Sequence, residues 1–165
     1  MPKGPAARVR DAVSHPGTPQ LQGAGSPNVF IGGRAAWRGM PAHAVPGLLG
    51  ARHAADAAIA AAEAVTLASV GTQAYPSNKA AEDLLKSNTA AAMSTTVALA
   101  AAGADLHSCA TPLPPPAHGP GAVIDGSTTV FINGFAACRM HDTIVEAVGA
   151  PNKILSGEPS VWIGG

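Results

Sequence analysis

Histidine and cysteine residues after position 104 have the types and the spacing of a zinc site. A single residue separates His107 from Cys109, and His118 follows nine residues after the cysteine. In an extended segment, residues two apart point to the same side, so His107 and Cys109 can reach one ion. Thiolate and imidazole groups are the usual ligands of tetrahedral zinc. The pattern indicates a metal site, but it is less specific than a pair of CxxC motifs.

The remaining ligand position has His15 as its best candidate, in the segment Ser14-His15-Pro16-Gly17. Four protein ligands would close the coordination sphere and leave no position for an activated water, so such a zinc would be structural. Two alternatives stay open. The residues can be separate polar loop residues, or Cys109 can form a disulfide with Cys138, which would compete with zinc. We expect Cys138 to pack as a small apolar group.

The other histidines favour simpler interpretations. His141 and Asp142 are adjacent, and neighbouring residues in a turn normally point apart, so an acid–base pair is not expected. His43 is interpreted as a solvated loop residue and His53 as a helix-surface residue, although His43 or His141 could replace one proposed zinc ligand. The sequence contains no HExxH or GxSxG motif. We therefore predict that the protein is not an enzyme.

The elements that must position these residues include a strand signature present in three copies. Each copy reads as valine, an aromatic residue, isoleucine and a stop that contains glycine. The copies are Val29-Phe30-Ile31, Val130-Phe131-Ile132 and Val161-Trp162-Ile163. Internal repetition implies one supersecondary unit built several times, and three such units can be arranged about a pseudo-threefold axis.

The chain divides into two outer β regions and a helical middle. Residues 1–44 and 105–165 are rich in Gly, Pro, Thr and Val, which predicts short strands and many turns. Residues 45–104 are rich in alanine and predict an inserted helical hairpin, with helices over about 47–70 and about 78–102. The apolar stripe of the first helix consists of Leu48, Ala51, Ala55, Ile59 and Ala62. The insert explains why the first two repeat copies lie farther apart than the last two.

Charge and composition exclude several kinds of partner. The formal net charge is +0 and only 12% of the residues are charged, so no footprint for nucleic acid or an anionic membrane is visible. The first residues contain no apolar segment, so we expect no secretory signal peptide and synthesis in the cytoplasm. The uncharged run 87–104 contains several Ser, Thr and Asn residues and mostly alanine, so we expect no stable membrane insertion.

The outer regions resemble the PAAR-repeat proteins, which form the spike tip of type VI secretion and related contractile injection systems. The segments that carry the resemblance are Ser14-His15-Pro16-Gly17-Thr18-Pro19, the three repeat copies with their flanking residues, His107-Ser108-Cys109 and Pro116-Ala117-His118-Gly119. The motif that names the family departs from its usual form, because alanine replaces proline in Ala35-Ala36-Trp37-Arg38 and in Ala136-Ala137-Cys138-Arg139. The usual Gly-Asp that follows is lost after Arg38 and becomes His141-Asp142 in the other copy.

The resemblance implies a mainly β fold, a small cone of three pseudo-repeats, with the helical hairpin inserted after the first repeat. Its base would dock on the blunt end of a trimeric valine-glycine-repeat spike protein (VgrG), with one copy per trimer. Near the apex, a structural zinc would be held by three histidines and a cysteine, which correspond here to His15, His107, Cys109 and His118. The resemblance also implies export from a bacterial cytoplasm by the secretion machine, to the extracellular space or a target cell.

The function expected from these observations is that of a non-enzymatic spike tip. It would sharpen the spike, help it to pierce the target membrane and recruit effector cargo. The insert 45–104 would serve as a docking surface for an effector, adaptor or chaperone. Two alternatives come from other classes, namely a zinc-dependent hydrolase or effector, and a free-standing β-repeat binding module.

Overall fold

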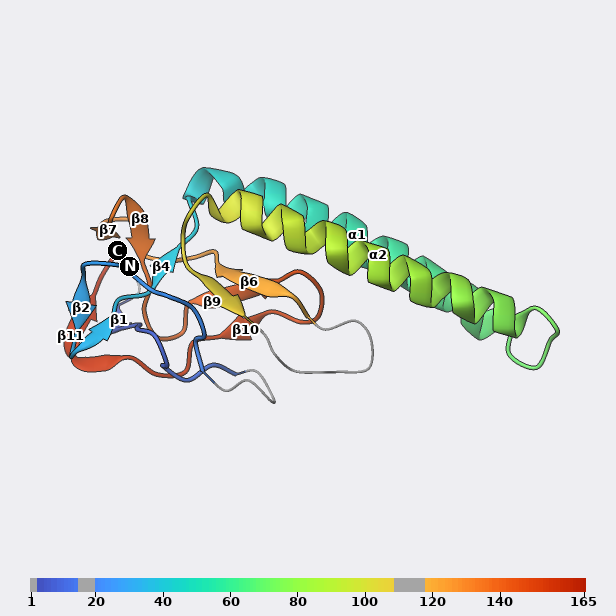
Figure 1. The fold of residues 1–165 in the computed structure, drawn as a ribbon, viewed down its shortest axis with the longest axis horizontal. Helices are drawn as coiled ribbons and strands as arrows, with labels where there is room; N and C mark the ends of the chain where they lie inside the picture. Colours follow the sequence, from blue (N-terminus) through green and yellow to red (C-terminus); the bar gives the residue numbers. More distant parts are fainter. Residues whose placement is uncertain (1–2, 15–19, 109–117) are drawn as a thin grey trace.

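The computed structural model describes residues 3–14, 20–108 and 118–165. Within these residues it contains two α-helices and four antiparallel sheets. The molecule is elongated, with the short strands gathered toward one end and the helical hairpin lying along one side and projecting beyond them (Figure 1). The described chain contains more helix than strand, so it is a mixed α and β protein rather than a mainly β one. The inserted hairpin is the reason, because its helices are far longer than the strands.

Each repeat copy forms one strand of an antiparallel pair. The pairs are β2 (Phe30–Ile31) with β3 (Arg34–Ala35), β7 (Phe131–Ile132) with β8 (Phe135–Ala137), and β11 (Glu158–Ile163) with β1 (Gly4–Ala6). The first two are hairpins whose turns, Gly32-Gly33 and Asn133-Gly134, have positive φ at both residues. Glycine and asparagine tolerate this conformation, which tight hairpin turns require. The third pair is formed by two strands from opposite ends of the sequence.

A closed ring of backbone hydrogen bonds joins the three units. The N–H of Trp37 donates to the carbonyl of Ala7 at 2.9 Å, and that of Ala7 donates to Cys138 at 2.9 Å. The N–H of Cys138 then donates to Trp37 at 3.1 Å, which closes the cycle. The three residues hold the same position in the three units, so the units are related by an approximate threefold rotation. Trp37 and Cys138 are fully buried in the adjoining core, as expected for Cys138.

An arginine–aspartate ion pair follows the ring residue in every unit. In each pair the aspartate also accepts a hydrogen bond from the backbone N–H of the arginine, at 2.7–2.9 Å. The pairs are Arg8–Asp11, Arg38–Asp105 and Arg139–Asp142. Arg38 and Arg139, which follow the repeats at equivalent positions in the sequence, therefore both form ion pairs within the chain. The aspartate missing after Arg38 is restored by Asp105, which lies beyond the helical insert.

The chain also forms a four-stranded sheet. Its strand order is β10 (Asn152–Lys153), β9 (Thr143–Glu146), β6 (Pro120–Val123) and β5 (Leu106–Ser108). One further strand, β4 (Arg38–Gly39), pairs with β8 and leads through a short 3-10 turn, Ala42–Ala44, into the insert. One candidate metal-binding histidine, His107, is on β5 of this sheet, and His118 lies just before β6.

The predicted helical hairpin is confirmed, with α1 at Val45–Ala68 and α2 at Tyr75–Ala101. Each helix has a proline in its first turn, Pro46 or Pro76, where the missing N–H has no helical partner to lose. This explains why α2 begins at Tyr75, before the start that the sequence predicts at about residue 78. All five residues of the predicted apolar stripe are buried or half-buried. None of the helices in the described residues combines the length and apolarity needed to cross a bilayer.

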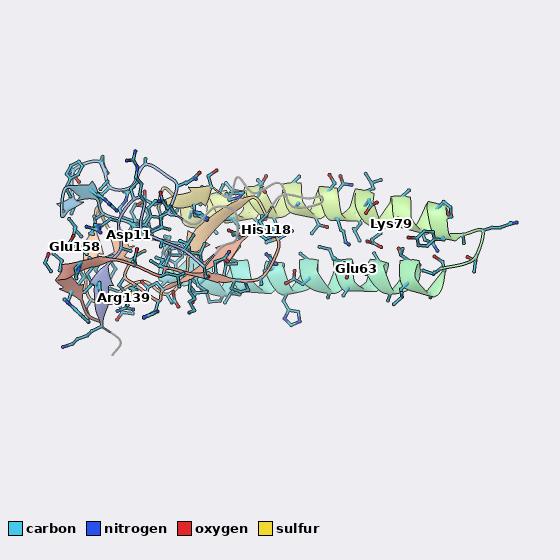
Figure 2. All side chains as sticks on the ribbon, turned by 90° about the horizontal axis from the view of Figure 1, so that it is seen from below. Asp11, Glu63, Lys79, His118, Arg139 and Glu158 are labelled. Carbon is cyan, nitrogen blue, oxygen red and sulfur yellow. The ribbon has the colours of Figure 1, made fainter. Side chains whose placement is uncertain are left out.

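The two helices meet through alanines and through a charged cluster in the outer half of the hairpin. Glu82 is 5% exposed and accepts hydrogen bonds from the ammonium groups of Lys79 at 2.9 Å and Lys86 at 2.6 Å. Lys86 also pairs with Glu63 of the other helix at 2.7 Å. Figure 2 shows Glu63 and Lys79 on the facing helices. The cluster therefore ties α1 to α2 where the hairpin projects from the body.

We expect the outer half of the hairpin to loosen in acid. The bonds from Lys86 and then Lys79 lower the pKa of Glu82 from 4.5 to about 2. Because this pKa is lower in the folded state, the stabilisation is complete above about pH 4.5 and is lost as the pH falls toward 2. Amide exchange measured between pH 5 and 2.5 should show residues 59–89 losing protection. Glu82→Gln should remove this pH dependence, whereas Asp83→Asn, at an exposed site, should preserve it.

Candidate metal centre

Two of the predicted zinc ligands, His107 and His118, converge on one carboxylate. Nδ1 of His118 lies 2.9 Å from Oε2 of Glu146, and Nε2 of His107 lies 3.7 Å from Oε1 of the same residue. The side chains of Glu146 and His107 are almost completely buried, whereas that of His118 is 19% exposed. Glu146 is not among the residues predicted from the sequence. Its only signal was a single carboxylate in the otherwise apolar run Ile144-Val145-Glu146-Ala147-Val148.

The register of the sheet explains why these residues meet. His107 on β5 is opposite Gly121 on β6, and Gly121 is opposite Glu146 on β9. Directly opposed residues point to the same face, so the side chains of His107 and Glu146 can meet above the glycine. A Cβ atom at Gly121 would lie 2.8 Å from Cγ of Glu146. The glycine therefore leaves the space in which the two side chains approach each other.

The surroundings of His118 favour its neutral form. Burial, with a smaller contribution from the positive charge of Arg52, lowers the pKa of His118 below 6.5. A neutral imidazole is the form that binds a metal ion. An ionised Glu146 carboxylate would only accept hydrogen bonds, which would place the proton of this 2.9 Å contact on Nδ1 of His118. The Nε2 atom would then keep its lone pair.

The helical insert contributes to this region through Arg52 of α1. Its guanidinium donates to the backbone carbonyls of Glu146, at 2.6 Å, and of Gly149. It also pairs with Asp56 at 3.0 Å. Arg52 is 9% exposed and lies against the sheet. Helix periodicity does not predict this contact, because it cannot show that two backbone carbonyls lie within reach of the guanidinium.

The other candidate residues are placed as follows. His15 and Cys109 lie outside the described residues, as does the proposed Cys109–Cys138 disulfide; Cys138 itself is a free thiol whose pKa is raised by burial. His43, His53 and His141 are exposed. Residues 3–14, 20–108 and 118–165 contain no group of three or more His, Cys, Asp or Glu side chains arranged to hold a metal ion. The described part of the chain thus brings together two of the four predicted ligands.

A second candidate site is a set of exposed aromatic residues, one in each repeat. Phe30, Phe131 and Trp162 are 63%, 60% and 63% exposed. They hold equivalent positions, because Phe30 is opposite Ala35, Phe131 is opposite Ala136 and Trp162 is opposite Pro5 in the three strand pairs. Their strands β2, β7 and β11 lie at the end of the molecule away from the helical tip (Figure 1). We refer to these three residues as the aromatic triad.

Comparisons with known proteins add no identification. No family model matches the chain, and neither a curated protein nor a solved structure matches it significantly.

Proposed function

We propose that this protein is a spike-tip protein that binds the end of a trimeric VgrG-type spike, as the resemblance to PAAR-repeat proteins implies. The observation that supports the proposal best is the aromatic triad on a ring of three backbone-linked units. A surface with approximate threefold symmetry can make a similar contact with each chain of a threefold-symmetric partner. Exposed aromatic residues are also the side chains that contribute most to protein interfaces.

The conical shape and a role in piercing membranes are part of the same proposal, as is export with the spike. The protein would act without enzymatic activity, so its contribution would be mechanical. A small β body with short strands has a limited core, and a metal that joins its segments would stiffen it. We propose that zinc has this role and that His15, His107, Cys109 and His118 are its ligands.

The contacts at Glu146 fit this zinc proposal. Nδ1 of His118 lies 2.9 Å from the carboxylate, so the second ring nitrogen, Nε2, is directed away from it. Metal-binding histidines commonly donate their other N–H to a carboxylate in this way. Nε2 of His107 lies 3.7 Å from the same carboxylate, and its Nδ1 accepts a hydrogen bond of 3.4 Å from the N–H of Gln22. Zinc bound here would link segments that are far apart in the sequence.

Binding to a candidate spike trimer tests the central proposal. Purified protein mixed with a trimeric VgrG-type protein should form a complex of one chain per trimer, measured by size-exclusion chromatography with light scattering. Approximate threefold symmetry within one chain predicts this ratio. A complex with three chains per trimer, or the absence of any complex, would contradict the proposal.

The insert would provide a separate docking surface for an effector, adaptor or chaperone. The supporting observation is a set of exposed apolar residues on its projecting half, Val65, Leu67, Val70 and Leu84. Pull-downs from the producing cell with wild-type protein and with a Leu67→Lys, Leu84→Lys variant would test this role. Capture of the same partners by both proteins would contradict this docking role of the insert.

A further inference from the structure

We propose that Glu146 is a positioning residue of the metal centre, which holds the ring of His118 so that its second nitrogen, Nε2, can bind zinc. The inference rests on the zinc site proposed above and adds a residue outside the predicted ligand set. Glu146 itself would not be a ligand. Its role would be to orient His118 and to select the tautomer of this ring.

The contact between Glu146 and His118 is the main support for this positioning role. The carboxylate is completely buried and its Oε2 lies 2.9 Å from Nδ1 of His118, within hydrogen-bond distance. As an ionised acceptor, Glu146 would place the proton on Nδ1 and leave the lone pair on Nε2, which is the state required for coordination. Without this acceptor the imidazole could place its proton on either nitrogen and could rotate.

The same carboxylate also lies near the other histidine. Its Oε1 is 3.7 Å from Nε2 of His107, beyond hydrogen-bond distance, and the ring of His107 is 1% exposed. His107 and Glu146 come from strands on either side of Gly121, so sheet register rather than sequence proximity sets their separation. One buried group therefore faces both described members of the predicted ligand set.

The backbone around His118 is held by neighbouring elements. A Cβ atom at Gly149 would lie 2.9 Å from Nε2 of the ring, so the glycine packs directly against it. Arg52 of the insert bonds to the carbonyls of Glu146 and Gly149, while the N–H of Val148 donates to the carbonyl of His118 at 3.1 Å. These contacts fix the positions of the carboxylate and the ring relative to each other.

The test is a comparison of zinc affinity in tag-free wild-type protein and in Glu146→Gln, measured by competition with a chromogenic chelator. We expect the variant to bind zinc about 10- to 100-fold more weakly. The metal-free variant should keep nearly the wild-type melting temperature, because glutamine preserves the size of the side chain and one acceptor oxygen. Glu63→Gln, on the exposed part of α1, is the matched control and should retain wild-type affinity. A purely structural role would instead lower the melting temperature of the metal-free protein and leave the affinity of the folded fraction unchanged.

A second pair of variants keeps the inference testable if Glu146→Gln does not fold. Gly149→Ala should push the ring of His118 aside and weaken zinc binding. Gly134→Ala is its control, because both glycines have positive φ, 95° and 82°, but a Cβ atom at Gly134 would contact nothing. We expect reduced zinc affinity in the first variant only.

The outcomes separate this inference from the proposal on which it rests. Wild-type protein that holds no zinc would overturn the zinc site and the role of Glu146 together. Wild-type protein that holds zinc, with equal affinity in Glu146→Gln, would overturn the role of Glu146 alone. If Glu146→Gln does not fold, unchanged affinity in Gly149→Ala would overturn the inference in the same way.

Discussion

A variant that replaces the whole aromatic triad with serine should lose binding to a trimeric spike while keeping its fold. Buried interface aromatics commonly contribute about 2 kcal/mol or more each. A single replacement at Phe30, Phe131 or Trp162 should therefore weaken binding roughly 30-fold, and the triple variant more than about 1,000-fold. The fold should persist because the three side chains are about 60% exposed in the free protein. Isothermal titration calorimetry would measure the affinities, and circular dichroism the fold.

The approximate symmetry makes this prediction specific. Because the three residues hold equivalent positions, the three single variants should lose similar amounts of affinity. Tyr75→Ser is the control, since Tyr75 is an exposed aromatic residue at the start of α2, far from the triad. Wild-type affinity in the triple variant would rule out the triad as the docking site. A loss confined to one single variant would show that docking is asymmetric.

The ion pair between Arg38 and Asp105 should be among the most stabilising polar contacts in the protein. Its side chains are 11% and 3% exposed, and Asp105 accepts bonds from the backbone N–H, Nε and Nη2 of Arg38 at 2.8–3.0 Å. Asp105→Ala leaves the buried guanidinium and one N–H without their acceptor. We expect the free energy of unfolding to fall by about 3–5 kcal/mol, measured by urea denaturation.

A matched control exists on the helical insert. Asp56 also pairs with a buried arginine, Arg52, but is 55% exposed. Asp56→Ala should lower the free energy of unfolding by less than about 1 kcal/mol, because water screens and replaces an exposed partner. Equal losses in the two variants would contradict the view that Asp105 restores the third ion pair of the ring.

The helical insert separates the two members of one arginine–aspartate pair in the sequence. Arg8 and Arg139 have their aspartates three residues later, a spacing that can be seen in the sequence. For Arg38 the equivalent aspartate, Asp105, is separated from it by the whole hairpin, so it is absent from the sequence next to Arg38. The chain can tolerate this insertion because α1 and α2 run antiparallel, which brings the end of the insert back beside its start (Figure 1).

Sequence periodicity was sufficient for local features. The alternation of valine, aromatic residue and isoleucine predicted the three strands. Alanine-rich segments with apolar residues at helical spacing predicted both helices and the apolar stripe of the first one. The pattern that contains His107 and His118 also included two residues that lie near the same carboxylate. These features depend on residues close together in the chain, so short-range patterns contain the information.

Contacts between distant segments could be seen only in the folded chain. The third strand pair joins β11 to β1, and Glu146 reaches His107 through the register of three strands. The contact of Arg52 with the sheet was not predicted, because its acceptors are backbone carbonyls, which carry no sequence signal. The amino-acid order by itself thus determined which elements form and which faces are apolar. The tertiary structure decided which side chains meet, because pairing register and chain closure depend on packing of the whole molecule.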